Sequence, residues 1–500
     1  MNGNPATLIP VALFLLLGLG ITFFVRYQSR KRRETGFVSE YFIGSRSLGA
    51  FVLAMTTIAT YGSVSSFVGG PGQAWNVGFG WVYMATIQVT ALFLLYGIMG
   101  KKMALVSRKL GAITVIDVIR ARYQSNALAN ISAIVIVLFF GATMVAQFVG
   151  GAKLFEAVTG YSYEVGLAIF GIAAILFTAL GGFRGVAFVD TLCGIAMIVG
   201  IFVLAGGILN AGGGYANIMG NLQTHNSQLL DPLGGGDMPI GLYFTQWLLV
   251  GVFTFCLPQS VVRCMGYKDS KSLRQAMIIG TIIIGAMMIG VTALGVLAKG
   301  ILPADLSGYG NSVDNIIPLA IVQSLPPWLA GVAIIGPVAA SISTVASLLI
   351  FSSSSIIKDM YLHYREEKND VPSGKQVARY SQVFTFVVGV IVFVLSVVPP
   401  DVIWKINMFA FGGLETAFCW VLVMGLFWKK ANKIGALCST VGGTLAYCGT
   451  MAAGITFFGL HQIVIGITIS LLCMVVGSLV VSSKATSEKE KEIRLVFFGE

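Results

Sequence analysis

Thirteen apolar stretches, each about 20 residues long, occupy most of this 500-residue chain. A helix of that length crosses the hydrocarbon core of a bilayer, which is roughly 30 Å thick. Only helices and closed barrels span this core, because no water is present there to pair with free backbone groups. We therefore predict an all-α polytopic membrane protein. Its predicted spans are residues 8–25, 47–71, 79–99, 128–150, 163–180, 187–209, 241–257, 276–297, 327–357, 380–398, 403–427, 434–456 and 462–482.

The basic residues predict which side of the membrane each loop faces. If residues 26–46 are cytoplasmic, all but three of the 32 lysines and arginines fall on the cytoplasmic side. The exceptions are Lys153, Lys299 and Lys405. Such a distribution follows the positive-inside rule, so we expect the N-terminus outside and the C-terminus in the cytoplasm. The net charge of +11 then reflects topology and contact with anionic lipid headgroups, and no nucleic-acid partner is expected.

The first predicted span is expected to be a membrane anchor. It has no basic leader before it and no small-residue cleavage site after it. Its arginines and lysine, from Arg26 to Arg33, follow the apolar run instead of preceding it. This order is unlike that of a signal peptide.

The second predicted span is interrupted. Between Met55 and Gly72 it carries six Ser/Thr hydroxyls, four glycines and a proline. Irregular backbone at membrane depth persists where it lines a cavity or coordinates an ion. In the seventh span Pro258 removes an N–H donor and frees a carbonyl one turn earlier. Two interrupted helices near the midplane are typical of inverted-repeat transporters.

The ninth predicted span carries hydroxyls on one face. Ser343, Ser347 and Ser354 share that face, with Thr344 beside Ser343. Small hydroxyl residues often serve only to pack helices closely. Opposite a broken helix, they also offer the hard oxygens that a small cation such as Na⁺ prefers.

Two carboxylates and one lysine have both a functional and a structural interpretation. Ionisable groups inside spans are functional candidates, which singles out Asp190 and Glu415. Alternatively, Asp190 is a helix N-terminal carboxylate and Glu415 pairs with a neighbouring helix. Lys405 is either a partner for a solute carboxylate or an interfacial anchor.

Other classes of protein are disfavoured. The seven cysteines stand singly and the histidines do not cluster, so neither a metal site nor a disulfide is predicted. No nucleophile–base set or phosphate loop is present, so neither an enzyme nor a cofactor is expected. A channel needs a continuous polar pore, and a sensor needs an output domain larger than the tail at 483–500.

Four motifs resemble the sodium:solute symporter family over nearly the whole chain. They are Tyr41–Gly49 (YFIGSRSLG), Thr114–Asp117 (TVID) followed by Arg122 and Tyr123, Ala179–Arg184 (ALGGFR) with Asp190, and Gly425–Ala436 (GLFWKKANKIGA). The resemblance implies sodium-coupled import by alternating access in the bacterial cytoplasmic (inner) membrane. It also implies a single transporter domain with a LeuT-like 5+5 inverted-repeat core. The expected parts are an extra helix at 8–25, repeats at 47–209 and 241–427, two extra helices within 434–482 and a cytoplasmic tail at 483–500.

Within the family, further segments resemble the branch that transports pantothenate. They are SEYFIGSRSLG, SSFVGGPG, ARYQS, QFVGGAKL, VRCMGYKDSK, SIIKDMYL and FAFGGLE. Pantothenate is therefore the expected solute, and proline, sialic acid, a sugar or another carboxylate are the alternatives. Sodium is the expected coupling ion, and no obligate protein partner is implied.

The resemblance also nominates binding residues. It assigns sodium to the backbone carbonyls of Ala59, Gly62 and Ala340 and to the hydroxyls of Ser343 and Thr344. Asp190 and Ser347 match a second sodium site or ion path, but Ala346 lacks the hydroxyl that two-sodium members carry there, and Cys193 stands where many relatives have glutamine. The nominated solute contacts are Tyr61, Ser63, Ser65, Ser66, Gln88, Thr254, Pro258, Gln259 and Asn407. One sodium per pantothenate anion would make uptake electroneutral.

Overall fold

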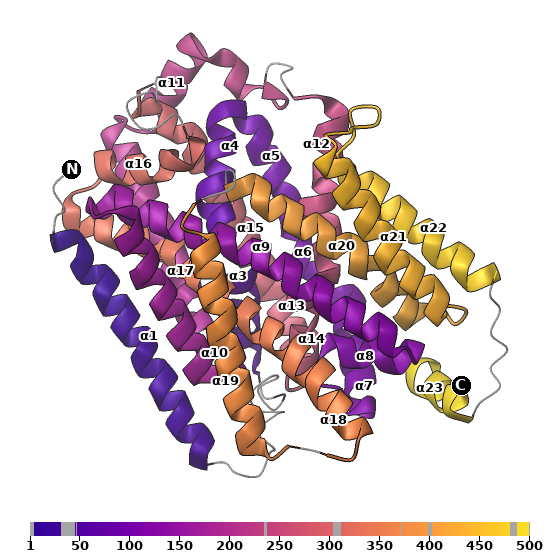
Figure 1. Cartoon of the computed structure of the whole chain (residues 1–500). Coiled ribbons are helices and arrows are strands. Elements are labelled where there is room, and N and C mark those ends of the chain that lie inside the picture. The colour runs from indigo at the N-terminus through magenta and orange to yellow at the C-terminus, as the bar shows by residue number, and fades with distance from the viewer. Residues whose placement is uncertain are drawn as a thin grey trace.

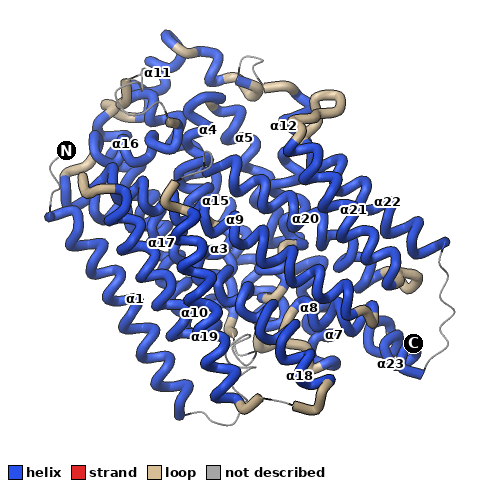
Figure 2. The backbone as a smooth tube through the Cα atoms, in the orientation of Figure 1, coloured by secondary structure: helices blue, strands red, loops and turns tan. Residues whose placement is uncertain are grey.

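The computed structural model describes residues 5–31, 46, 48–234, 238–303, 312–370, 372–398, 403–480 and 488–499. These residues are helical almost throughout (Figure 2), and the one departure from helix and loop among them is an isolated bridge between Leu48 and Tyr267. The predicted all-α class is therefore confirmed. Most of the predicted motif Tyr41–Gly49 lies outside the described residues.

The first half of the chain contains the first interrupted helix. Its elements are α1 (Pro5–Lys31), α3 (Ala50–Tyr61), the π-helical turn η2 (Ser65–Gly69), α4 (Gly70–Val77), α5 (Phe79–Ala85), η3 (Thr86–Val89), α6 (Thr90–Leu94), η4 (Leu95–Gly100), α7 (Lys101–Leu110), α8 (Val115–Tyr123), α9 (Asn126–Thr159), α10 (Tyr163–Ala211), α11 (Tyr215–His225) and η5 (Ser227–Leu230).

The second half contains the second interrupted helix. Its elements are α12 (Ile240–Trp247), η7 (Leu248–Val252), η8 (Phe253–Cys256), α13 (Pro258–Val261), α14 (Arg263–Gly266), α15 (Ser270–Leu297), η9 (Ala298–Gly300), η11 (Val313–Asn315), α16 (Ile316–Ser324), α17 (Pro327–Ser353), η12 (Ser354–Leu362), α18 (His363–Glu367), α19 (Gly374–Leu395), α20 (Ile403–Phe427), α21 (Lys433–Ala452), α22 (Gln462–Val480) and α23 (Glu488–Phe498).

The number of membrane spans stays a prediction. Among the described residues, eight helices are long and apolar enough to cross a bilayer, or ten if each of two bent pairs is one span. The expected total of thirteen also counts α19, whose apolar part is short, and α21, and it divides α10 into two.

Helix α10 contains a break at the place where two spans were predicted to meet. Its 49 residues would extend about 73 Å at 1.5 Å per residue, more than twice the thickness of the hydrocarbon core. Gly182 has φ 58° and ψ −171°, a conformation open essentially to glycine alone. This glycine lies between the predicted spans 163–180 and 187–209 and interrupts the helix there.

Both predicted interruptions are confirmed. Helix α3 ends at Tyr61, Gly62 is extended (φ −68°, ψ 118°), and the segments on either side are bent by 62°. The second break falls at Leu257, which is extended (φ −61°, ψ 124°) because Pro258 disfavours a helical residue before it. The bend there is 42°.

Two of the sequence motifs form helix ends. Thr114 and Asp117 make a capping box at the start of α8, each side chain accepting the other's backbone N–H. Arg122 donates to the carbonyls of Gly425 and Trp428 at the end of α20, at 2.8 and 3.1 Å. Asn432 then caps α21. These motifs therefore join helices at one end of the bundle.

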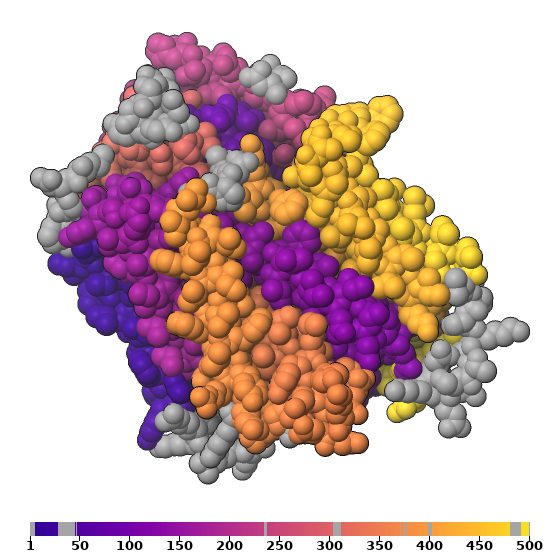
Figure 3. All heavy atoms as spheres, in the orientation of Figure 1, coloured from indigo at the N-terminus to yellow at the C-terminus, as the bar shows by residue number. Residues whose placement is uncertain are grey.

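The interior of the bundle is built around α17. Buried residues make up 94% of its most apolar window, and the helix packs against α1, α9 and α10. In Figure 1, α1 lies along one margin of the bundle and α21 and α22 along the opposite margin. Helix α19 forms part of the surface in Figure 3, where Phe386, Val394 and Leu395 are 56–61% exposed. Such apolar exposure suits contact with lipid.

Candidate functional site

A buried side-chain amide from α9 forms a hydrogen bond with the backbone at the first helix break. The Gln147 side-chain oxygen accepts the backbone N–H of Val64 at 2.8 Å, and the Gln147 carbonyl accepts the Ser341 hydroxyl at 2.7 Å. Gln147 is fully buried, so without it the Val64 N–H would be unpaired in an apolar interior. Gln147 was not among the predicted site residues, although a lone amide within an apolar span was a visible signal.

The five positions predicted to bind sodium lie together beside this break. The Ser343 hydroxyl donates to the Ala59 carbonyl at 2.8 Å and is 3.1 Å from that of Ala340. The Thr344 hydroxyl lies 2.9 Å from the Ala340 carbonyl and 3.3 Å from the Gly62 carbonyl. Three carbonyls and two hydroxyls therefore converge between α3 and α17. This is an oxygen set of the kind that hard cations prefer.

Six of the nine predicted solute residues line one small cavity. They are Tyr61, Ser63, Ser65, Ser66, Gln88 and Asn407, joined by Val250, Trp404, Met408 and Phe411. The cavity has a volume of about 20 Å³, which is room for about one water molecule. The hydroxyl of Tyr61 donates to the Val250 carbonyl at 2.6 Å, so the two interrupted helices meet at its wall.

The other three predicted solute residues do not line this cavity, although Thr254 lies beside it. The Thr254 hydroxyl donates to the Gly251 carbonyl within its own segment, at 2.9 Å. Pro258 lines a separate cavity of about 20 Å³ that includes Phe351 and Asp359. The backbone oxygen of Gln259 accepts a bond from Arg263. Pro258 and Gln259 therefore do not reach the cavity that contains Tyr61, whereas the Thr254 side chain contacts Tyr61 at its wall.

A much larger cavity adjoins the small one. It has a volume of about 1050 Å³, and its lining includes Gln73, Trp81, Gln246, Lys405 and His461. Trp404 and Met408 line both cavities, so the two cavities adjoin at these residues. Burial lowers the pKa of His461 to about 4, so its ring is neutral near pH 7. We call the larger cavity the vestibule.

Asp190 and Ser347 lie close together, and both contact the side chain of Arg263. Arg263 was counted among the basic residues of a cytoplasmic loop, and this assignment is wrong. Its side chain is 1% exposed, and its Nη2 lies 3.5 Å from Asp190 Oδ2 and 3.0 Å from the Ser347 hydroxyl. The chain continues as helix beyond Pro258, so Arg263 lies inside the bundle.

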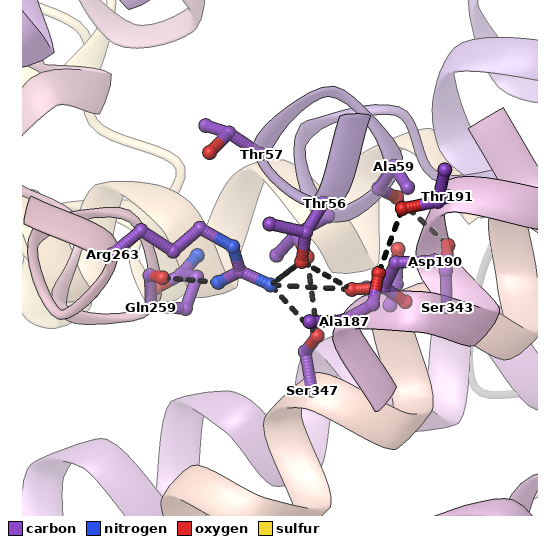
Figure 4. A network of polar contacts seen from close by, with 12 residues as sticks. Thr56, Thr57, Ala59, Ala187, Asp190, Thr191, Gln259, Arg263, Ser343 and Ser347 are labelled. Atoms are coloured by element: carbon purple, nitrogen blue, oxygen red, sulfur yellow. Dashed lines mark hydrogen bonds and ion pairs between the residues drawn. The ribbon is translucent and has the colours of Figure 1, made fainter. Parts of the chain in front are cut away.

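Hydroxyls from α3 complete the surroundings of this ion pair (Figure 4). The Thr56 hydroxyl donates to Asp190 Oδ2 at 2.7 Å, and Arg263 also donates to the Thr60 hydroxyl. Figure 4 shows the guanidinium pointing toward Thr56, Asp190 and Ser347, which come from three different helices. We call Thr56, Thr60, Asp190, Arg263 and Ser347 the arginine network.

Glu415 is fully buried in α20, and neither of its carboxyl oxygens has a hydrogen-bond partner among the described residues. Lys405 lines the vestibule in the first turn of the same helix.

Comparison with known sequences identifies one family. The model of the sodium:solute symporter family matches residues 41–443. The sodium/pantothenate symporter of Escherichia coli strain K12 is 41% identical over 94% of this chain and 96% of its own length. The sodium/pantothenate symporter of Haemophilus influenzae is 38% identical over 95% of this chain and 96% of its own length.

Solved structures show the fold. A Na⁺-coupled sialic acid symporter in a substrate-bound outward-open state has a TM-score of 0.81 at 19% identity, covering 97% of this chain and 99% of its own. A nucleobase-cation-symport-1 family transporter in a closed conformation has a TM-score of 0.56 at 13% identity, covering 91% of this chain and 98% of its own. The chain thus has the LeuT-like fold of sodium-coupled carriers, and it belongs to the sodium:solute symporter family.

Proposed function

We propose that this protein imports pantothenate together with sodium across the bacterial cytoplasmic membrane. The observation that carries the proposal is the convergence of five oxygens from α3 and α17 beside a polar cavity at the first helix break. The names and coverage of the two relatives support pantothenate as the solute. The apolar helices long enough to cross a membrane and the family support a transporter.

Sodium binds, in this proposal, at the carbonyls of Ala59, Gly62 and Ala340 and the hydroxyls of Ser343 and Thr344. The two hydroxyls now donate to these carbonyls. On ion binding they rotate so that a lone pair, and not the proton, faces the site. The ion then holds α3 against α17 by contacts to both helices.

Pantothenate binds next to this ion in the cavity lined by Tyr61, Ser65 and Asn407. Hydroxyl and amide groups there offer donors and acceptors to a solute that carries hydroxyls, an amide and a carboxylate. Ligand pockets usually measure about 300–1,000 Å³, so a cavity of about 20 Å³ must widen before the solute enters. The vestibule provides the approach, and the side chains of Trp404 and Met408 form the barrier.

The proposed topology places the N-terminus outside and the C-terminus in the cytoplasm. The start of α1 lies toward the same end of the molecule as α11 and α16, and α23 lies toward the end that carries α7, α8 and α18 (Figure 1). Opposite ends for the two termini support an odd number of spans. We retain the repeats at 47–209 and 241–427 as a proposal, with an extra helix at 8–25, two at 434–482 and a tail at 483–500.

Uptake into proteoliposomes tests the function. Labelled pantothenate, proline and sialic acid are each offered with an inward sodium gradient, and in parallel with potassium replacing sodium. We expect accumulation of pantothenate alone, and only with sodium. Sodium-driven uptake of proline or sialic acid in preference to pantothenate would reject pantothenate as the solute but would still support coupling to sodium.

Counterflow distinguishes a carrier from a channel. Vesicles preloaded with unlabelled pantothenate should take up labelled pantothenate faster than empty vesicles, because a carrier exchanges solute through one site. A channel gives no such acceleration. Equal rates in loaded and empty vesicles would reject alternating access.

A further inference from the structure

The arginine network contains a buried positive charge that the proposed mechanism does not use. Arg263 begins α14, in the second half of the second broken helix, and is almost completely buried. Its Nη1 donates to the Gln259 carbonyl at 2.5 Å, and its Nη2 faces Asp190 Oδ2 at 3.5 Å. The cation–carboxylate pair therefore lies inside the bundle, where an isolated charge would be costly.

The groups around Nη2 are those that a sodium ion binds. They are one carboxylate, from Asp190, and three hydroxyls, from Thr56, Thr60 and Ser347. The Thr60 and Ser347 hydroxyls also lie 3.1 Å from each other. Four oxygens from α3, α10 and α17 therefore surround one point, and the cation at that point belongs to an arginine side chain. Figure 4 shows this arrangement for Thr56, Asp190 and Ser347.

This point lies next to the five oxygens proposed to bind the coupling sodium. Ser347 follows Ser343 by one helical turn on α17, and the Ala59 carbonyl that faces Ser343 belongs to the same helix as Thr56 and Thr60. A mobile cation bound between Asp190 and Ser347 would be in direct contact with the guanidinium. Like charges at that separation repel strongly in a buried site.

We propose that the guanidinium of Arg263 is a tethered cation that fills a latent second sodium site formed by Thr56, Thr60, Asp190 and Ser347. Its presence limits the carrier to one mobile sodium per solute. Asp190 Oδ1 has no hydrogen-bond partner among the described residues, so the carboxylate has capacity for a further ligand once the guanidinium is gone. This inference rests on the proposed sodium-coupled transport and specifies its stoichiometry.

The substitution Arg263→Gln tests the inference. It removes the charge and leaves the four oxygens, so a second sodium ion can bind. Tracer sodium and labelled pantothenate fluxes are measured in the same proteoliposomes. We expect a sodium-to-solute ratio of about 1 in the wild type and about 2 in the variant, with solute-dependent inward current only in the variant. A ratio of about 2 in the wild type, an unchanged ratio in an active variant, or a proton entering in place of the second sodium would each overturn the inference.

A binding measurement covers the case in which the variant does not transport. Tracer sodium bound per molecule of purified protein is counted in detergent, where turnover is not needed. We expect about one ion for the wild type and about two for Arg263→Gln. In the double variant Asp190→Asn with Arg263→Gln both charges are absent, and we expect about one bound sodium ion per molecule. If Arg263→Gln does not fold, two ions on the wild type or on the double variant still overturn the inference.

Arg122→Gln is the matched control. Arg122 is a half-buried arginine that donates to the end of α20 and lies outside the arginine network. The same substitution there should leave the sodium count at about one. A rise in this control would show that loss of any arginine exposes extra sodium sites, which contradicts the inference. If the wild type showed no sodium-driven pantothenate uptake, the proposed function would be rejected. The number of sodium ions bound per molecule would still test the proposed role of Arg263, because that measurement does not need transport.

Discussion

At the scale of single residues, two neighbouring hydroxyls on α17 are hydrogen-bonded to the C-terminal end of α3, where the first helix break begins. Ser343 and Thr344 each contact a carbonyl of α3 or of the adjoining Gly62. If they bind sodium, the double variant Ser343→Ala with Thr344→Ala loses two of five ligands. A bond to a charged group contributes about 1.5–3 kcal/mol, so we expect the sodium concentration for half-maximal uptake to rise at least about 100-fold.

Ser352→Ala is the control for this prediction. Ser352 is buried in the same helix, and its hydroxyl has no hydrogen-bond partner among the described residues. Its removal should leave the sodium dependence of uptake unchanged. Sodium-driven uptake that persists with wild-type affinity in the double variant would refute the proposed ion site.

A second prediction concerns the amide that holds the break open. Gln147→Ala leaves the Val64 N–H without its acceptor, at a cost of about 1–3 kcal/mol. We expect faster thermal inactivation of the purified protein. Gln246→Ala is the comparison, because the Gln246 side-chain oxygen has no partner to lose among the described residues. Equal inactivation rates for the two variants would show that Gln147 does not support the break.

The residues that sequence reasoning found and missed differ in a physical way. Ser343 and Thr344 are polar groups in an apolar helix, and such groups stand out in a sequence. Arg263 follows the predicted end of the seventh span at residue 257, so its charge was assigned to a cytoplasmic loop. Only the packing of α3, α10 and α17 around it shows that this charge is buried.

At the scale of elements, α10 depends on one glycine. Gly182→Ala places a Cβ at φ 58° and ψ −171°, a backbone conformation that costs about 1–3 kcal/mol for a residue other than glycine. We expect a lower midpoint of thermal inactivation. Gly185→Ala is the matched control, because it lies in the same helix and an added Cβ there meets no atom within 4 Å. If both variants were destabilised to the same degree, the backbone conformation of Gly182 would not be the cause of the lower midpoint in Gly182→Ala.

Helix breaks were predictable from local chemistry, but helix junctions were not. Pro258 constrains the residue before it, and the glycines and hydroxyls between Met55 and Gly72 disfavour a continuous apolar helix. Both effects act within a few residues. By contrast, nothing local to the sequence predicted that α17 continues into η12 and α18 without a gap, from Pro327 to Glu367.

At the scale of the whole molecule, the proposed stoichiometry fixes the response to voltage. One sodium and one pantothenate anion move no net charge, so a potential imposed across the proteoliposome membrane should leave initial uptake unchanged. A second sodium would gain about 2.3 kcal/mol per 100 mV, equivalent to about 50-fold in accumulation. Initial rates and final accumulation at 0 and −100 mV distinguish the two cases. Accumulation that grows with an inside-negative potential would reject electroneutral uptake.

The sequence predicted the family and the class of fold because motifs and apolar runs are local. It did not predict that the vestibule is wide while the solute cavity is nearly closed. These volumes depend on how α9, α12 and α20, which are far apart in the chain, pack around Trp404 and Met408.

The thin partition between the two cavities has a pharmacological consequence. Trp404 and Met408 line both a volume of about 1050 Å³ and one of about 20 Å³, and in the proposed mechanism they form the barrier between them. A pantothenate analogue with a bulky apolar tail would place its polar head past Trp404 and leave the tail among the apolar residues of the vestibule. The partition then cannot reseal behind it. Such a compound would act as a competitive blocker that is held without being carried across.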